Sequence, residues 1–222
     1  MKHFFIILLF NLIAPIFSQE QDSLLIGKKY FEDQLYIGVS SNTFFNKPND
    51  FKQHSISTGF QAGFIKDIPI NKKGNLAFGI GIGYEFNKYK QNLKIPDYTF
   101  EDIILPQESN HFTTHAIVFP ISFRYRTSTS RIHPYYRVYA GARLIYAYSS
   151  LSKYISEDEN IEVKNISSLN KWQYGPQLTV GYGNVNLYVS MVLSDIFKQP
   201  EDDGIDVSQL REYRLGLQFY IF

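Results

Sequence analysis

Four side chains in the middle of the chain have the types that nucleophilic catalysis needs. Glu108, Ser109, His111 and His115 lie in one short stretch, and a serine, a histidine and a carboxylate together support acyl transfer. However, His111 and His115 share one face of an extended strand, and neighbours in sequence do not by themselves form a triad. We therefore predict no catalytic residues and no enzymatic activity.

The remaining composition excludes several other chemistries. The chain has no cysteine, so it has no disulfide, no thiolate metal site and no cysteine nucleophile. His54 and His133 are not spaced as metal ligands, and we predict neither a metal nor a cofactor. Lys and Arg total 22 against 21 Asp and Glu, and this balance argues against a nucleic-acid partner.

The first residues are typical of an export signal. Met1-Lys2-His3 is basic, residues 4–13 are apolar apart from Asn11, and residues 14–18 lead into a polar stretch. This order predicts a secretory signal peptide over residues 1–18, since the apolar run is shorter than the roughly 20 residues of a spanning helix. Residues 19–33 are then expected to form a periplasmic N-terminal segment.

The elements that position the remaining side chains follow a period of two. From Leu76 to Phe86, large apolar or aromatic residues alternate with small or charged ones, so one face of a strand is apolar and the other nearly bare. The bare face contains Gly79, Gly81 and Gly83, which suit a crowded, narrow barrel interior. Seven further segments alternate in the same way, and their aromatic ends are expected to form girdles at the two membrane surfaces.

The connections between the eight segments also alternate in length. The first, third, fifth and seventh connections are long (44–54, 88–110, 149–171 and 196–210), and those between them are short (67–75, 127–133 and 184–186). A transmembrane barrel whose N-terminus is periplasmic has long outer loops and short inner turns in this order. We therefore predict that residues 34–222 form a single eight-stranded antiparallel up-and-down β-barrel of the outer membrane.

Several charged residues fall on the inward face of this predicted barrel. An eight-stranded barrel has room only for side chains, so these charges are expected to form a structural ion-pair network. The predicted network comprises Glu85, Arg124, Arg137, Arg143 and Arg214. Arg124, Arg126 and Arg137 have no acid in a neighbouring predicted strand. We expect Glu20, Asp22, Glu32 or Asp33 to close over them at the periplasmic mouth. Pro120 removes a ladder hydrogen bond and predicts a bulge or kink.

Three short motifs resemble a known family. They are the run Ile117–Tyr125 with Pro120 at its centre, Pro134 followed by Tyr139-Ala140-Gly141, and the terminal Tyr220-Ile221-Phe222. With these motifs the chain resembles the small outer-membrane β-barrel family of Bacteroidota-type bacteria that includes PorT. The resemblance implies an outer-membrane location and, because some relatives serve secretion and gliding, secretion-system proteins as partners. The terminal aromatics Tyr220 and Phe222 are similar to the signal read by the barrel assembly machinery, which is a further expected partner.

Three functions remain open at this stage. The first is a structural or interaction role in the lipid bilayer of the outer membrane, accessory to protein secretion. The second is a soluble periplasmic lipocalin-like barrel that binds an apolar ligand, which requires apolar residues to face inward. The third is an outer-membrane enzyme that modifies lipid through the histidine-containing stretch at 108–115.

Overall fold

Eleven strands and no helix make up the described part of the computed structural model, which covers residues 33–53, 55–94, 99–100, 109–127, 136–156, 160–198, 207 and 209–221. Eight strands form the barrel: β1 (Asp33–Phe45), β2 (Ser57–Pro69), β3 (Leu76–Lys90), β6 (Ser109–Arg126), β7 (Tyr136–Ile155), β9 (Trp172–Tyr182), β10 (Val185–Val192) and β11 (Arg211–Ile221). The others are β4 (Leu93–Lys94), β5 (Thr99–Phe100) and β8 (Asn160–Lys164). No described helix is long and apolar enough to cross a membrane.

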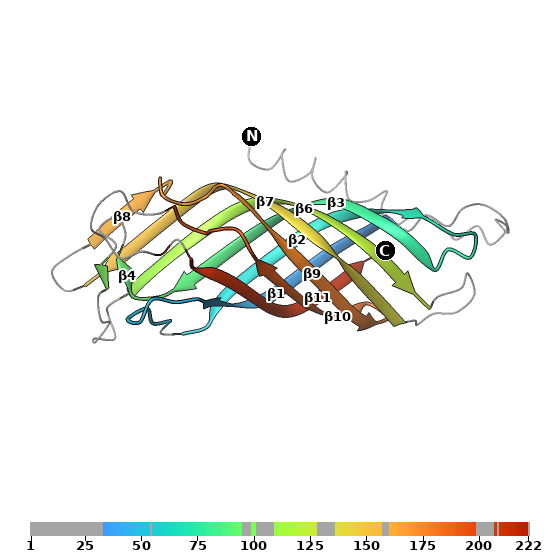
Figure 1. The fold of residues 1–222 in the computed structure, drawn as a ribbon, viewed down its shortest axis with the longest axis horizontal. Coiled ribbons are helices and arrows are strands. Elements are labelled where there is room, and N and C mark those ends of the chain that lie inside the picture. Colours follow the sequence, from blue (N-terminus) through green and yellow to red (C-terminus); the bar gives the residue numbers. More distant parts are fainter. Residues whose placement is uncertain are drawn as a thin grey trace, which may run out of the picture.

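The eight strands close on themselves. Each pairs antiparallel with its neighbours, β1 pairs with β11, and β6 pairs with both β3 and β7 (Figure 1). The predicted eight-stranded antiparallel barrel is confirmed. β8 adds a short strand to the extended end of β7, and β4 and β5 form a separate two-stranded sheet.

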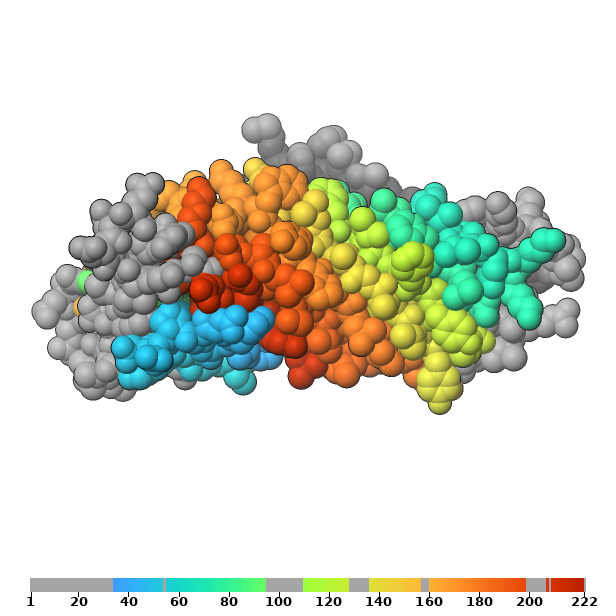
Figure 2. Space-filling model, viewed as in Figure 1, coloured from blue at the N-terminus to red at the C-terminus, as the bar shows by residue number. Residues whose placement is uncertain are grey.

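Apolar side chains face outward along every barrel strand. Leu35, Ile37 and Val39 on β1 are exposed, whereas Tyr36 and Asn42 on the same strand are buried inside. In Figure 2, β1 and β11 lie against each other in the continuous outer wall. The inner face holds most of the buried polar residues. This arrangement is the reverse of a soluble protein and matches a barrel in lipid.

Two aromatic rows bound the apolar wall. Tyr136 pairs with Tyr182 near one end of β7, and Tyr146 pairs with Trp172 further along the same strand. The ten steps from Tyr136 to Tyr146, at about 3.3 Å each and a tilt of about 40°, span roughly 25 Å across a membrane. That height matches the apolar band of outer-membrane barrels, and we call this band the apolar belt.

The two ends of the barrel differ in their connections. One end has the short turns 70–75, 127–135 and 183–184, and the other has the long connections 46–56, 91–108, 156–171 and 193–210. We call them the short-turn end and the long-loop end. The turn between β9 and β10 contains only Gly183 and Asn184, and Gly183 has a φ of 59°, which glycine adopts without a steric penalty.

The ladder between β6 and β3 is interrupted at Pro120, opposite Gly81 and Ile82, whereas Pro120 pairs in register with Arg143 on β7. The predicted break in a ladder therefore lies at Pro120, but without a change of register. The register shift between β6 and β7 falls instead at His115/Ala116. There β7 contains one extra residue, which reverses its alternation, and β7 continues to Ile155 where the sequence predicts a loop from residue 149.

Candidate functional site

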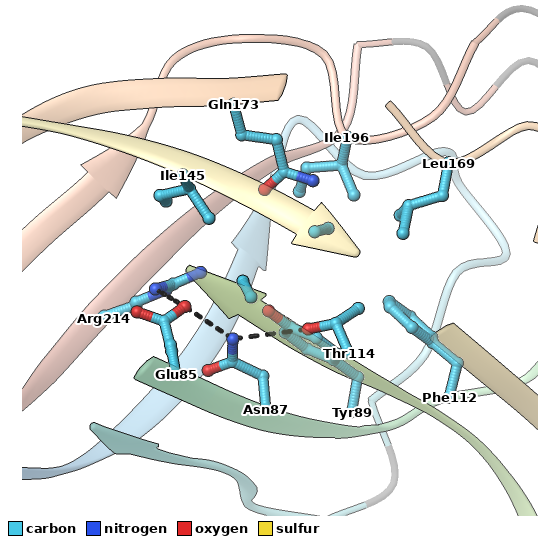
Figure 3. Close-up of a pocket in the computed structure, with 12 residues that line it drawn as sticks. Glu85, Asn87, Tyr89, Phe112, Thr114, Ile145, Leu169, Gln173, Ile196 and Arg214 are labelled. Atoms are coloured by element: carbon cyan, nitrogen blue, oxygen red, sulfur yellow. Dashed lines mark hydrogen bonds and ion pairs between the residues drawn. The ribbon is translucent and has the colours of Figure 1, made fainter. Parts of the chain in front are cut away.

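Three predicted lumen charges meet halfway along the barrel. Glu85 on β3 accepts hydrogen bonds from Arg143 on β7 and Arg214 on β11, one on each carboxylate oxygen. Figure 3 shows Glu85 between Arg214 and Asn87, whose amide donates to Glu85 Oε1 at 2.7 Å. All three charged side chains are buried. Inward-facing residues from three strands that are far apart in the sequence therefore form one compact ion cluster.

Glu212 completes the charge balance of this cluster. Its carboxylate binds Arg214 Nη2 at 2.8 Å and accepts a hydrogen bond from the Tyr89 hydroxyl at 2.9 Å. Two carboxylates thus face two guanidinium groups, and we call Glu85, Glu212, Arg143 and Arg214 the central charge cluster. Glu212 lies outside the predicted network, although it shares the inward phase of Arg214, two residues away.

A second cluster lies toward the short-turn end. Asp67 on β2 binds Arg124 and Arg126 on β6, the latter at 3.2 Å. Arg124 also donates to Gln34 Oε1 at 2.7 Å, and its guanidinium lies 3.8 Å from the ring centroid of Tyr139. These contacts hold the guanidinium between an anion, an amide and an aromatic face.

Asp67 corrects the prediction that the arginines at this mouth have no acid beside them. β2 continues to Pro69, and Asp67 pairs with Gly79, so its side chain follows Gln61 and Ile65 into the lumen. The sequence pattern instead places Asp67 in a turn, and a residue in a turn has no predicted inward or outward direction. Glu20, Asp22 and Glu32 lie outside the described residues, as does the side chain of Asp33.

The five predicted network residues therefore divide between two levels. Glu85, Arg143 and Arg214 belong to the central charge cluster, and Arg124 belongs to the second cluster. Arg137 is buried near Arg124, with its guanidinium 5.2 Å from the ring of Tyr220. Tyr220, a predicted assembly residue, points inward and packs edge-on against Tyr36 and Tyr139. Phe222 lies outside the described residues.

Replacing Asp67 with asparagine is expected to lower the free energy of unfolding by roughly 2–3 kcal/mol. The substitution removes the anion shared by two buried guanidinium groups, while Gln34 and Tyr139 still contact Arg124. Urea unfolding in detergent measures the change. The matched control is Asp195→Asn, which changes an exposed pair with Arg211 and should alter stability by less than about 1 kcal/mol. Equal effects of the two variants would contradict the prediction.

An apolar cluster closes the long-loop end. Phe44, Tyr89 and Phe112 stack inside the barrel mouth, with centroids 4.4–6.2 Å apart. Buried residues of the long connections pack with them: Phe51, Leu93, Ile166, Leu169, Ile196, Phe197, Val207 and Leu210. We call these eleven residues the apolar cap. Its connections also bond to one another, for example where Asn92 N donates to the Lys52 carbonyl at 3.1 Å.

Two small cavities lie between these layers. One cavity lies beside Glu85 and Arg214 and another beside Tyr36 and Arg143, each of about 10 Å³. This volume is enough for about one water molecule. The charged lumen also contradicts the alternative of a lipocalin-like barrel, because an apolar ligand needs an apolar interior.

The candidate catalytic residues do not meet at an inward site. His111 and His115 are both on the outward face of β6, and His115 Nδ1 shares a hydrogen bond of 2.7 Å with the Tyr84 hydroxyl. Glu108, the side chain of Ser109, His54 and His133 lie outside the described residues. Within the described part of the chain, no group of three or more histidines and acids could hold a metal ion.

Solved structures and a family model were compared with this chain. Among solved structures, the chain is similar to Ail, the attachment invasion locus protein of Yersinia pestis, with a TM-score of 0.38 and 12% identity over 87% of this chain and 100% of that chain. It is also similar to Neisserial surface protein A, with a TM-score of 0.38 and 14% identity over 86% of this chain and 98% of that one. No curated protein matches the sequence.

A family model described as an outer membrane protein beta-barrel domain matches residues 17–198. The match covers most of the chain and includes the strands that supply Glu85, Asp67, Arg124 and Arg143. The outward apolar belt and the closed barrel agree with this assignment and with a location in the lipid bilayer of the outer membrane. The chain therefore belongs to the outer membrane protein β-barrel family.

Proposed function

We propose that this protein is a non-conducting interaction protein that displays its long-loop end at the cell surface. The observation that supports the proposal is the filling of the barrel at three levels. These are the second cluster, formed by Asp67 with Arg124 and Arg126, the central charge cluster and the apolar cap. An eight-stranded barrel has no channel once its interior is occupied by side chains. The protein then serves to hold a folded surface in the membrane.

The proposed orientation places the short turns in the periplasm and the long connections outside, as is usual for barrels of this class. Residues 1–18 act as the signal peptide in this scheme, and residues 19–33 form a periplasmic segment before the barrel. Tyr220 and Phe222 form the signal for the barrel assembly machinery during insertion. After folding, Tyr220 contributes its ring to the lumen beside Arg124.

We further propose that the partner belongs to a protein-secretion system, as in the PorT-like relatives. The proposal is supported by the motif Ile117–Tyr125, which forms the membrane part of β6, and by the unequal strand lengths. β6 and β7 have 18 and 20 residues, against 8 in β10. One side of the barrel therefore extends beyond the apolar belt as a rigid sheet, and rigid scaffolds that carry loops are common recognition surfaces.

Photocrosslinking in intact cells tests this interaction role. A photoreactive residue at Ser167 or Lys198, both exposed at the long-loop end, should form a defined crosslink to another envelope protein. The matched control at Lys72, exposed in a short turn, should not form it. Crosslinks only at Lys72 would contradict the proposed surface. A crosslinked partner that is unrelated to secretion would refute the role in secretion but not the interaction role.

The same purified protein is expected to conduct no ions. In planar bilayers, its insertion should give no current steps above the empty membrane, because the lumen offers room for only isolated waters. A porin inserted under the same conditions confirms that steps are detectable. Reproducible steps from the folded barrel would contradict a filled lumen and the non-conducting role.

A further inference from the structure

Four basic or titratable side chains form a row on the outer surface of the barrel. Lys88 and Lys90 are on β3, His111 is on β6 and Lys153 is on β7. Lys90 pairs with His111, and His111 pairs with Lys153 across the next ladder. Directly opposed residues in neighbouring strands have their Cβ atoms about 5 Å apart. We call these four residues the basic row.

The basic row faces the same way as the lipid-facing residues. Lys88 and Lys90 continue the outward phase of Tyr84 and Phe86 along β3. His111 continues the outward phase of His115, and Lys153 faces outward because of the extra residue in β7. Without that register shift, Lys153 would point into the barrel mouth, and Tyr154 would face out.

An aromatic group lies directly below the basic row. His115 is at its centre, 5.0 Å from the ring centroid of Phe86, 6.0 Å from Tyr84 and 6.3 Å from Tyr148. The Tyr84 hydroxyl and His115 Nδ1 share a hydrogen bond. Rings with a polar edge are suited to the boundary between hydrocarbon and headgroups. The outward surface therefore changes from apolar to aromatic to cationic along β3, β6 and β7.

The height of the row places it in the headgroup layer. Tyr84 is in register with Tyr146 through Ile117. Lys88 and Lys90 are four and six residues beyond Tyr84 on β3, which corresponds to roughly 10 and 15 Å above Tyr84 at the same rise and tilt. Lysine side chains reach several ångströms along a surface. Such a height suits a headgroup that contains sugars better than a thin phospholipid headgroup.

The charge of the row is positive. Lys90 and Lys153 flank His111 in register on the two neighbouring strands, and Lys88 lies two residues from Lys90 on β3. Among the described residues, the acid nearest in register is Glu162, opposite Lys153, and it pairs with Lys164 at 3.3 Å. Three ammonium groups thus surround one imidazole ring that can donate a hydrogen bond.

We propose that the basic row and the aromatic group beneath it bind a phosphorylated glycolipid of the outer leaflet. The lysines would neutralise its phosphates, His111 would hydrogen-bond to a phosphate or sugar oxygen, and the aromatic group would contact the sugar rings. The inference rests on the proposed orientation, which puts the long-loop end in the outer leaflet. The inference assigns a ligand to a lipid-facing surface, and the proposed interaction role does not depend on that surface.

Lipid retention tests the site. Wild-type protein and the variant Lys88→Gln/Lys90→Gln/Lys153→Gln are purified from mixed micelles of phosphatidylcholine and bisphosphorylated lipid A. The ratio of the two lipids retained is measured by native mass spectrometry. Each lysine near a charged membrane surface contributes about a fivefold preference, so the triple variant should lose roughly tenfold to hundredfold in this ratio. Lysine-to-arginine changes at the same positions should retain lipid A.

The matched control removes three lysines at the other end: Lys66→Gln/Lys72→Gln/Lys73→Gln has the same net charge as the test variant. An unchanged ratio in the test variant, or an equal loss in the control, would overturn the proposed site. Heat-modifiable gel mobility shows that each variant is folded. Preferential loss in the control alone would indicate that the orientation is reversed, and photocrosslinking at Ser167 and Lys72 tests that orientation separately. Replacement of lipid A by a lipid without phosphate should abolish the preference of the wild type.

Discussion

Replacing Glu85 with alanine is expected to lower the free energy of unfolding by about 3–5 kcal/mol. Glu85 is 2% exposed and is the anion shared by Arg143 and Arg214. Its removal leaves two buried guanidinium groups with one remaining carboxylate, Glu212, which contacts only Arg214 among them. An uncompensated charge in a lumen filled by side chains cannot recover its hydration without opening the barrel.

Urea unfolding followed by heat-modifiable gel mobility measures this loss. The matched control is Glu162→Ala, because Glu162 is half-exposed in its pair with Lys164 and should contribute less than about 1 kcal/mol. The loss in the free energy of unfolding for Glu85→Gln should lie between the losses for Glu162→Ala and Glu85→Ala, since an amide retains the size of the side chain without its charge. A change below about 1 kcal/mol in Glu85→Ala would show that water enters the lumen freely.

Replacing Gly141 with alanine is expected to prevent assembly of a heat-resistant barrel. A Cβ atom at this position would overlap the Ile121 carbonyl oxygen and lie 2.6 Å from the Ser122 Cα on the neighbouring strand. Both are backbone atoms of β6, so no side chain can rotate to make room. The β6–β7 ladder would have to separate, with a cost of roughly 3 kcal/mol or more.

Gly38→Ala provides the control at another inward glycine. Its Cβ would meet the Gln61 side chain at 2.9 Å and the Leu217 carbonyl oxygen at 3.1 Å, and the flexible glutamine can move. The fraction of protein with heat-modifiable mobility after refolding should fall strongly for Gly141→Ala and only slightly for Gly38→Ala. Similar refolding yields for both variants would contradict the close approach of β6 and β7.

The alternation of side chains was sufficient to predict the barrel. The types of residues such as Leu35, Tyr36 and Ile37 predict which of them face lipid and which face the lumen, because successive side chains of a strand point to opposite sides. The alternation of long and short connections can likewise be predicted from the sequence, because it depends only on the spacing of the strands along the chain. The inward direction of Glu85, Arg143 and Arg214 follows from the same period. The register shift in β7, the ends of β2 and β7 and the short strands β4, β5 and β8 were not predicted, since one extra residue or one longer strand leaves no clear signature in the period.

The pairing of the inward charges was decided by the closed barrel. Glu85 meets Arg143 and Arg214 across sequence separations of 58 and 129 residues, and only the register of the strands sets which inward residues share a level. The same holds for Asp67 with Arg124, and for the aromatic rings that meet Tyr220. The apolar cap and the basic row depend further on how the long connections fold and on the register shift in β7. Alternation along one strand is local and can be predicted from the sequence, whereas the height of a residue in the barrel depends on every ladder between it and its partner.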